Sequence, residues 1–210
     1  SISSVHGVMD STPWIAAQTM AMRAGVPIVA GTNNPVATGT IMYDLPFGIN
    51  GVIAVSGIDS EAKVIRGVDI FGSGPADASG SSNLAFVAPA SQMLVPSSDD
   101  GWAPALGDGT SLATPLVAGA IALGLEKYPA ATGLQVLQWM IRTTSGDGLA
   151  KPLWSGPKYG YGIARPLDML AVDPTQFADK NPLFIYSGDD SRCGGRGFED
   201  CAWALMLPTS

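Results

Sequence analysis

Residues 107–123, GDGTSLATPLVAGAIAL, place a short polar turn directly before a long apolar segment. Two glycines and a threonine lead into Ser111, and the residues that follow carry no charge until Glu126. The apolar segment predicts a helix over residues 112–127 that is apolar on every face and therefore buried. Pro115 falls in the first turn of this helix, where its missing N–H costs little. The sequence thus places one hydroxyl, that of Ser111, at the N-terminus of a helix that is expected to be buried.

The hydroxyl of Ser111 has two explanations. Serine is a favoured N-cap, so the side chain could simply satisfy a free amide at the start of the helix. Alternatively, the N–H of Ser111 is one of the four amides without a helical partner, at the positive end of the helix dipole. Such an N–H can donate to a developing oxyanion while the Oγ attacks a carbonyl, as an acyl-transfer nucleophile requires. Gly109 would keep side chains away from an approaching substrate.

The rest of the chain predicts an α/β domain. Short apolar segments bounded by turns indicate strands at residues 1–5, 26–31, 51–58 and 85–89. Helices are expected at residues 13–24, 112–127 and 134–143, with a short one within 159–172. Continuous apolar strands are typical of a parallel sheet covered on both faces. We therefore expect a parallel β-sheet flanked by helices on both faces, incomplete at its N-terminal side because the chain begins within a strand.

Composition places the domain boundary and excludes some partners. Periodicity ends near residue 172, so residues 1–172 are expected to form the domain and residues 173–210 a tail of unknown function. The net charge of −7, with no basic cluster, argues against nucleic acid as a partner. No apolar run reaches the roughly 18 residues that a membrane helix needs, and no signal peptide is visible at the start. The sequence therefore predicts no membrane segment within this chain.

The two cysteines, Cys193 and Cys201, both lie in the tail. Their spacing and the glycines between them would allow a small disulfide loop, and two free thiols are the alternative. Because no histidine lies near them, they do not predict a metal site.

The segment around Ser111 resembles a known family. Residues 109–119, GTSLATPLVAG, meet every fixed position of the pattern Gly-Thr-Ser-x-Ala-[Ser/Thr]-Pro-x-Val-[Ala/Ser]-Gly, which surrounds the nucleophile of the subtilisin-like serine proteases, or subtilases. Four other segments resemble core segments of the family in the same order: AGVPIVAGTNN (24–34), GVIAVSGIDS (51–60), AFVAPA (85–90) and YGYGIARPLDML (159–170). The resemblance covers about residues 1–172 and implies a subtilisin-like fold and serine endopeptidase activity.

The resemblance also implies roles for individual residues. Ser111 would be the nucleophile, and Asn34 would be the side-chain donor of the oxyanion hole, with Asn33 as the alternative one position earlier. Two asparagines that only shape a turn are the structural explanation. The segment SISSVHG resembles the strand that pairs with the substrate backbone. The expected substrate-binding residues are Val5, His6, Gly7, Ala30, Gly31 and Thr32. Thr32 and Asn33 replace the usual Ala-Gly, which predicts a more polar floor of the specificity pocket.

The sequence offers no convincing general base. His6 is the single histidine, and it lacks the His-Gly-Thr-His setting of the family's base. We interpret it as a residue of the substrate cleft or as a structural or surface histidine. Four aspartates that precede the nucleophile loop lack an Asp-[Thr/Ser]-Gly setting and are interpreted as turn or surface carboxylates: Asp10, Asp44, Asp59 and Asp69. Asp108 lies beside the nucleophile loop, where it could tune the local electrostatics or simply be solvated. A serine nucleophile needs a base, so we expect the catalytic His and Asp upstream of this chain, which alone would be inactive.

The predicted function is a serine endopeptidase that cleaves polypeptides through an acyl-enzyme on Ser111. A non-catalytic subtilase-like binding or scaffolding module is the alternative. A serine esterase of another fold is disfavoured because GTSLA lacks the second glycine of the Gly-x-Ser-x-Gly elbow. The chemistry requires no cofactor. Calcium is common in the family, but no compact run of oxygen ligands assigns a site here. The acidic composition, the pair of cysteines and the family resemblance predict a secreted or cell-surface protein.

Overall fold

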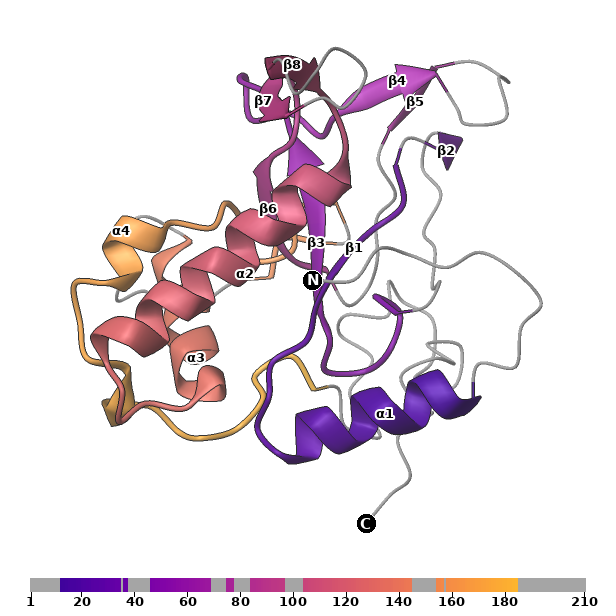
Figure 1. The fold of residues 1–210 in the computed structure, drawn as a ribbon. Coiled ribbons are helices and arrows are strands. Elements are labelled where there is room, and N and C mark those ends of the chain that lie inside the picture. Colours follow the sequence, from indigo (N-terminus) through magenta and orange to yellow (C-terminus); the bar gives the residue numbers. More distant parts are fainter. Residues whose placement is uncertain are drawn as a thin grey trace.

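The computed structural model describes residues 12–34, 36–37, 46–68, 75–77, 84–96, 104–144, 154–156 and 158–184 (Figure 1). Its helices are α1 (Thr12–Arg23), α2 (Thr110–Lys127), α3 (Gly133–Thr143), α4 (Pro166–Met169) and the 3₁₀ helix η1 (Pro174–Gln176). Its strands are β1 (Val29–Gly31), β2 (Val36–Ala37), β3 (Ile53–Ile58), β4 (Arg66–Val68), β5 (Pro75–Asp77), β6 (Leu84–Pro89), β7 (Met93–Pro96) and β8 (Pro104–Gly107).

The central sheet is parallel, as the apolar strands predict. Its three strands lie in the order β1-β3-β6, and Ala30 pairs with Ala54 in the first ladder. The second ladder pairs Val55 with Phe86, after a shift of register at the start of β3. Because the strands are parallel, their carboxyl ends meet at one edge, and the turn that precedes α2 lies at this edge (Figure 1).

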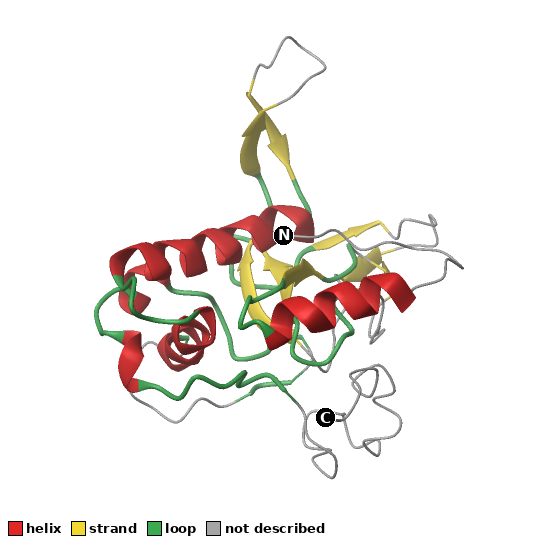
Figure 2. Cartoon of the chain, turned by 60° about the horizontal axis from the view of Figure 1, so that its bottom comes forward, coloured by secondary structure: helices red, strands yellow, loops and turns green. Residues whose placement is uncertain are grey.

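Both faces of the central sheet are covered. Alternate side chains of β3 enter two separate cores, because successive residues of a strand point to opposite faces. Ile53 and Val55 join the core that contains α2 and α3, whereas Ala54 packs in a second core against Ile15 and Met22 of α1. In Figure 2 the strands of the central sheet lie between the long helices α1 and α2. The expected α/β architecture is confirmed.

The helix boundaries follow local signals in the sequence. The side chain of Thr132 accepts from the N–H of Gln135, and the Gln135 side chain accepts from the N–H of Thr132, forming a capping box that begins α3. At the end of α1, Gly25 adopts a φ of 76°, a left-handed conformation that glycine reaches without a Cβ penalty. These signals place the ends of both helices within a residue or two of the prediction.

The smaller strands escaped prediction. β2, β5 and β4 form an antiparallel sheet in that order, and β7 pairs with β8 as a hairpin. They are two to four residues long, and several contain proline or glycine. Such segments lack the alternation that identifies a strand from its sequence.

The prediction that α2 is buried on every face is wrong within the described part of the chain. The side that faces the central sheet is buried, at Ala113, Val117 and Ala120 among others. On the opposite side, Leu116 and Leu123 are 44% and 48% exposed. The cause is geometric, because a single sheet covers only one side of a helix. The helix α3 approaches α2 closely at Gly124, near the C-terminal end of α2, where Val136 lies against it.

Residues 173–184, the first part of the expected tail, pack against the domain. The ring of Phe177 stacks on Trp139 with 5.3 Å between centroids, and the Asn181 amide donates to the carbonyl of Gly51 over 2.7 Å. Leu183 is 1% exposed within the core of α2 and α3. The packed structure therefore continues beyond residue 172 to residue 184, and the boundary at 172 stays a prediction.

Candidate active site

The turn between β8 and α2 requires glycine at position 109. Gly109 has a φ of 147°, in the region that disfavours other residues. A Cβ built on it would lie 3.1 Å from Asn34 Oδ1 and 3.3 Å from Ser111 Oγ. The N–H of Gly109 donates to the carbonyl of Ala90 over 2.8 Å, which ties the turn to the end of β6. Gly109 thus leaves open the space that the Asn34 and Ser111 side chains border.

Ser111 is not the cap of α2. The helix begins at Thr110, and its N-cap is Gly109, which has no side chain to offer. The explanation of Ser111 as an N-cap is therefore wrong. Its side chain is exposed, and its N–H lies in the first turn, where amides have no partner inside the helix. The hydroxyl and this amide both lie at the positive end of the helix dipole.

Asn34 is held by the residue that precedes Ser111. The N–H of Thr110 donates to Asn34 Oδ1 over 2.9 Å, and the oxygen of the Thr110 hydroxyl lies 3.2 Å from the same Asn34 oxygen. With the oxygen of its amide engaged, Asn34 has its Nδ2 left as a donor. Asn34 is exposed, whereas its neighbour Asn33 is 3% exposed. The structure therefore brings the predicted Asn34 and Ser111 to one turn.

Thr110 and Thr114 were missed by sequence analysis. The Thr110 hydroxyl donates to the buried carbonyl of Thr32 over 2.5 Å, and the Thr114 hydroxyl donates to the Thr110 carbonyl over 2.8 Å. A Cβ on Gly31 would lie only 2.7 Å from Thr114 Oγ1, so α2 approaches β1 closely at this point. The sequence held one signal of this contact. Thr110 and Thr114 are four residues apart and so lie on one face of the helix, and a glycine, Gly31, ends the strand β1 that this face contacts.

The predicted substrate-binding residues divide into two groups. Val5, His6 and Gly7 lie outside the described residues. Ala30, Gly31 and Thr32 are buried in and just after β1, the edge strand of the central sheet among the described strands. Both backbone polar groups of Thr32 already bond within the protein, since its N–H donates to the Val55 carbonyl over 2.9 Å and its carbonyl accepts from Thr110. Substrate binding at these positions stays a prediction.

A family comparison adds to this geometry. The model of the subtilase family matches residues 3–172. The chain is a subtilase. Comparison with curated proteins found no matching sequence.

Solved structures of proteases share the fold of this subtilase. The prenylagaramide maturation protease PagA superposes with a TM-score of 0.59 at 18% identity, over 81% of this chain and 58% of PagA. The self-cleaved protease domain of PatA gives a TM-score of 0.55 at 18% identity, over 74% of this chain and 53% of PatA. Fervidolysin from Fervidobacterium pennivorans, a keratinolytic enzyme related to subtilisin, gives 0.50 at 24% identity, over 75% and 24%. The subtilase chain thus spans less than two thirds of each of these proteins.

Asp108 supports the base of the hairpin β7–β8 in this subtilase. Its carboxylate accepts from the N–H of Gln92 over 2.6 Å. This hydrogen bond, followed by one from the Ser91 side chain, lowers the pKa of Asp108 below its ordinary value. Gln92 has a φ of 55°, an unfavourable conformation for a residue with a side chain, which the bond helps to hold. Asp108 therefore ties the turn that precedes α2 to Gln92, which lies just before β7.

Of the remaining aspartates and cysteines for which a role was predicted, the structure describes only Asp59. Asp59 accepts from the N–H groups of Glu61 and Lys63 over 2.9 and 3.0 Å, which confirms its reading as a turn residue. The other three aspartates named above and both cysteines lie outside the described residues. Among the residues that the structure describes, no three His, Cys, Asp or Glu side chains gather as they would around a metal ion. No helix in this described part has the length and apolarity to cross a membrane.

Proposed function

We propose that this chain carries the nucleophile and the oxyanion hole of a subtilisin-like serine endopeptidase. One observation supports this most strongly. The Ser111 hydroxyl and the Asn34 amide border the same space above Gly109, at the N-terminus of α2. An acyl-transfer site needs a nucleophile and hydrogen-bond donors that converge on one substrate carbonyl.

The proposed reaction proceeds through an acyl-enzyme. Ser111 Oγ attacks the carbonyl carbon of a peptide bond, and the base takes the hydroxyl proton. The oxyanion that forms accepts hydrogen bonds from Asn34 Nδ2 and from the N–H of Ser111. The C–N bond then breaks, and the base returns the proton to the leaving amine. Water, deprotonated by the same base, hydrolyses the Ser111 ester and releases the second product.

The general base is proposed to come from polypeptide upstream of Ser1. The single histidine, His6, has the wrong sequence setting for the role, and the described residues contain no histidine. The chain covers 58% of PagA and 53% of PatA, which leaves room in such a domain for the missing residues. We therefore expect a His-Gly-Thr-His-type motif and an Asp-[Thr/Ser]-Gly motif upstream, and an inactive chain without them.

The substrate is proposed to be an extended polypeptide. It would lie between the segment Ser4–Gly7 and the residues that lead to Asn34, with its scissile carbonyl at Ser111. The chemistry of this site requires no cofactor, and a structural calcium site stays unassigned. We further propose that the protein is secreted or displayed at the cell surface, from its family and its acidic composition.

The full-length gene product tests this function directly. Its purified, propeptide-free form should cleave an unfolded polypeptide substrate at internal peptide bonds. Ser111→Ala should abolish this cleavage without changing the fraction of the protein that is folded. The upstream coding sequence should contain both expected motifs. A folded protein that cleaves nothing and lacks these motifs would instead be a non-catalytic binding or scaffolding module. Cleavage that persists in Ser111→Ala would refute the assignment of the nucleophile.

A further inference from the structure

Residues 173–184, which we call the clasp, run along α3. In Figure 1 the clasp passes from η1 along α3 toward α1, in orange to yellow. The match to the subtilase family ends at residue 172, just before the clasp begins. The close packing of the clasp is therefore a feature that the family pattern does not account for.

Two glutamines of α3 hold the main chain of the clasp. The Gln135 amide donates to the carbonyls of Thr175 and Phe177 over 3.2 and 3.0 Å. The Gln138 amide donates to the carbonyl of Lys180 over 3.0 Å. Because the two glutamines are three residues apart, both amides lie on one side of the helix. Three carbonyls of the clasp are thus bound along α3.

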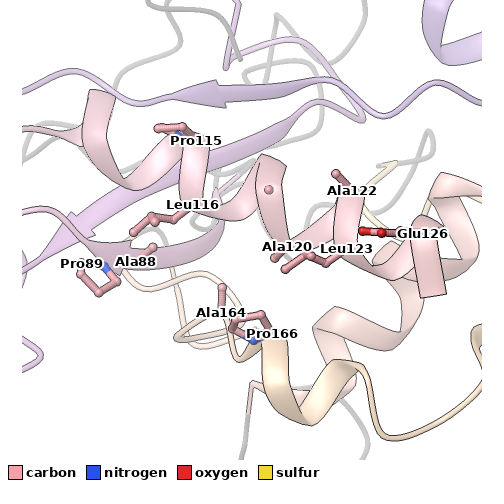
Figure 3. Close-up of a pocket in the computed structure, with 11 residues that line it drawn as sticks. Ala88, Pro89, Pro115, Leu116, Ala120, Ala122, Leu123, Glu126, Ala164 and Pro166 are labelled. Carbon is pink, nitrogen blue, oxygen red and sulfur yellow. The ribbon is translucent and has the colours of Figure 1, made fainter. Parts of the chain in front are cut away.

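The ring of Phe177 covers Trp139 of α3. The two rings are stacked, with 5.3 Å between centroids, and Arg142 Cζ lies 4.8 Å from the centroid of Phe177. Trp139 is 3% exposed. The helix α2 shows the contrary case, because a groove of about 650 Å³ lies along it, and Leu116 and Leu123 in its lining are exposed (Figure 3). Among the described residues, the clasp covers α3 as no segment covers this side of α2.

The end of the clasp reaches α1 and the start of β3. The Asn181 amide donates to the carbonyl of Gly51 over 2.7 Å, and its oxygen accepts from the N–H of Leu183 over 2.9 Å. A Cβ on Gly51 would lie 3.4 Å from Phe184 Cδ2 and 3.5 Å from Met22 Sδ. Leu183 itself is buried in the core of α2 and α3, whereas Met22 of α1 packs against the second core. The clasp therefore joins elements of both cores.

We propose that the clasp locks the domain shut at the edge of the central sheet opposite to Ser111, and that opening the clasp inactivates the protein by unfolding it. Gly51 precedes β3, so the clasp contacts the amino end of a parallel strand, whereas Ser111 lies at the carboxyl edge. Residues 178–180 are exposed. A cut there would convert the anchoring of Asn181 and Leu183 from an intramolecular contact into a bimolecular one. The loss of activity, but not the locking, rests on the proposed function.

Two truncations of the full-length protein test the clasp. Both carry Ser111→Ala to prevent self-cleavage, and thermal unfolding is followed by circular dichroism. The protein that ends at Phe184 should unfold within about 2 °C of the untruncated protein, whereas the one that ends at Val172 should unfold at least about 10 °C lower or show no cooperative transition. Equal midpoints for the two truncations would overturn the proposal. Loss of folding in the protein that ends at Phe184 would also overturn it, because residues after the clasp would then be required.

Point variants test the clasp even where a truncation prevents folding. Leu183→Ala removes a side chain that is 1% exposed and should lower the unfolding midpoint by at least about 4 °C. Its matched control, Leu94→Ala, removes a leucine that is 72% exposed and should lower the midpoint by less than about 1 °C. Asn181→Asp replaces the donor to Gly51 and keeps the acceptor for Leu183, and we expect a loss of at least about 2 °C at neutral pH. Shifts as small as that of Leu94→Ala in both clasp variants would contradict the proposal.

Labelling by a fluorophosphonate separates the clasp from the proposed function. In the protein with Ser111 intact, Leu183→Ala should be labelled within about twofold of the normal rate while it is folded, because the clasp is remote from the site, and should lose labelling above its unfolding midpoint. If the full-length protein is not labelled but truncation at Val172 unfolds it, the clasp stands and the protease assignment fails. If the protein that ends at Val172 is labelled as fast as the full-length protein, the clasp fails and the protease assignment stands.

Discussion

The N–H of Thr110 donates to the side-chain oxygen of Asn34 over 2.9 Å, so the first residue of α2 fixes the amide that follows β1. This bond joins segments 76 residues apart in the chain. It couples the orientation of the proposed oxyanion donor to the position of Ser111, one residue later. The coupling predicts that changes at Thr110 alter the rate of the reaction as well as the stability of the fold.

Thr110→Val tests this positioning role. It removes the hydroxyl that donates to the Thr32 carbonyl and lies 3.2 Å from Asn34 Oδ1, and it leaves the backbone bond to Asn34 in place. In the full-length protein, if it has the proposed activity, we expect kcat to fall by about tenfold with KM little changed, and the free energy of unfolding to fall by about 1–3 kcal/mol. Thr110→Ser keeps the hydroxyl and should restore kcat. A loss of stability with unchanged kcat would assign Thr110 to the fold alone.

Asn34→Ala removes the side-chain donor of the proposed oxyanion hole. Loss of one such donor lowers kcat by about 10²–10³ and leaves KM nearly unchanged, because the bond forms in the transition state. Steady-state kinetics on an unstructured peptide would measure the effect. Asn33→Ala serves as the comparison. A larger loss of kcat in Asn33→Ala than in Asn34→Ala would reverse the assignment.

Gly31→Ala tests the close approach of β1 and α2. The added Cβ would lie 2.7 Å from Thr114 Oγ1, inside van der Waals contact. We expect a loss of about 1–3 kcal/mol in the free energy of unfolding of the full-length protein, as overpacking of a core produces. Adding Thr114→Ala should recover part of this loss, with a coupling energy of about 0.5–3 kcal/mol. If denaturant unfolding shows that the effects of Gly31→Ala and Thr114→Ala are strictly additive, the strain does not arise between these two residues.

Asp108→Asn tests the support of the hairpin β7–β8. The N–H of Gln92, followed by the Ser91 side chain, lowers the pKa of Asp108 in the folded protein, so ionised Asp108 stabilises the fold. This stabilisation is complete above the unfolded-state pKa of about 3.9 and is lost as the pH falls through the lower folded-state pKa. Stability should therefore decline less steeply below about pH 4 in Asp108→Asn, which keeps an acceptor for Gln92. Parallel curves for the two proteins in denaturant titrations at different pH values would contradict this role.

Local patterns in the sequence predicted much of this fold, but they did not predict the contacts between segments that are distant in the chain. The strands β1, β3 and β6 and the helices α1, α2 and α3 follow from apolar runs, caps and turn glycines. Thr110 was missed because its partners, Thr32 and Asn34, are remote in the chain, and no period in the sequence reports such a contact.

The exposure of α2 shows a second limit of sequence patterns. An apolar segment predicts that a helix is buried, but the pattern does not say which polypeptide covers it. The sheet covers the side of Val117, and the described residues leave Leu123 exposed on the other side. The resemblance of GTSLATPLVAG to the subtilases indicated Ser111 because that motif is local. The general base escaped assignment because no residue of this chain has its setting.

Labelling with a fluorophosphonate tests directly whether Ser111 is an activated nucleophile. The folded, propeptide-free full-length protein would be treated with the reagent, digested and mapped by mass spectrometry. We expect one adduct on Ser111 that disappears in Ser111→Ala and is strongly reduced in an isolated chain that begins at Ser1. A folded full-length protein that carries no adduct on Ser111 would show that Ser111 is not an activated nucleophile.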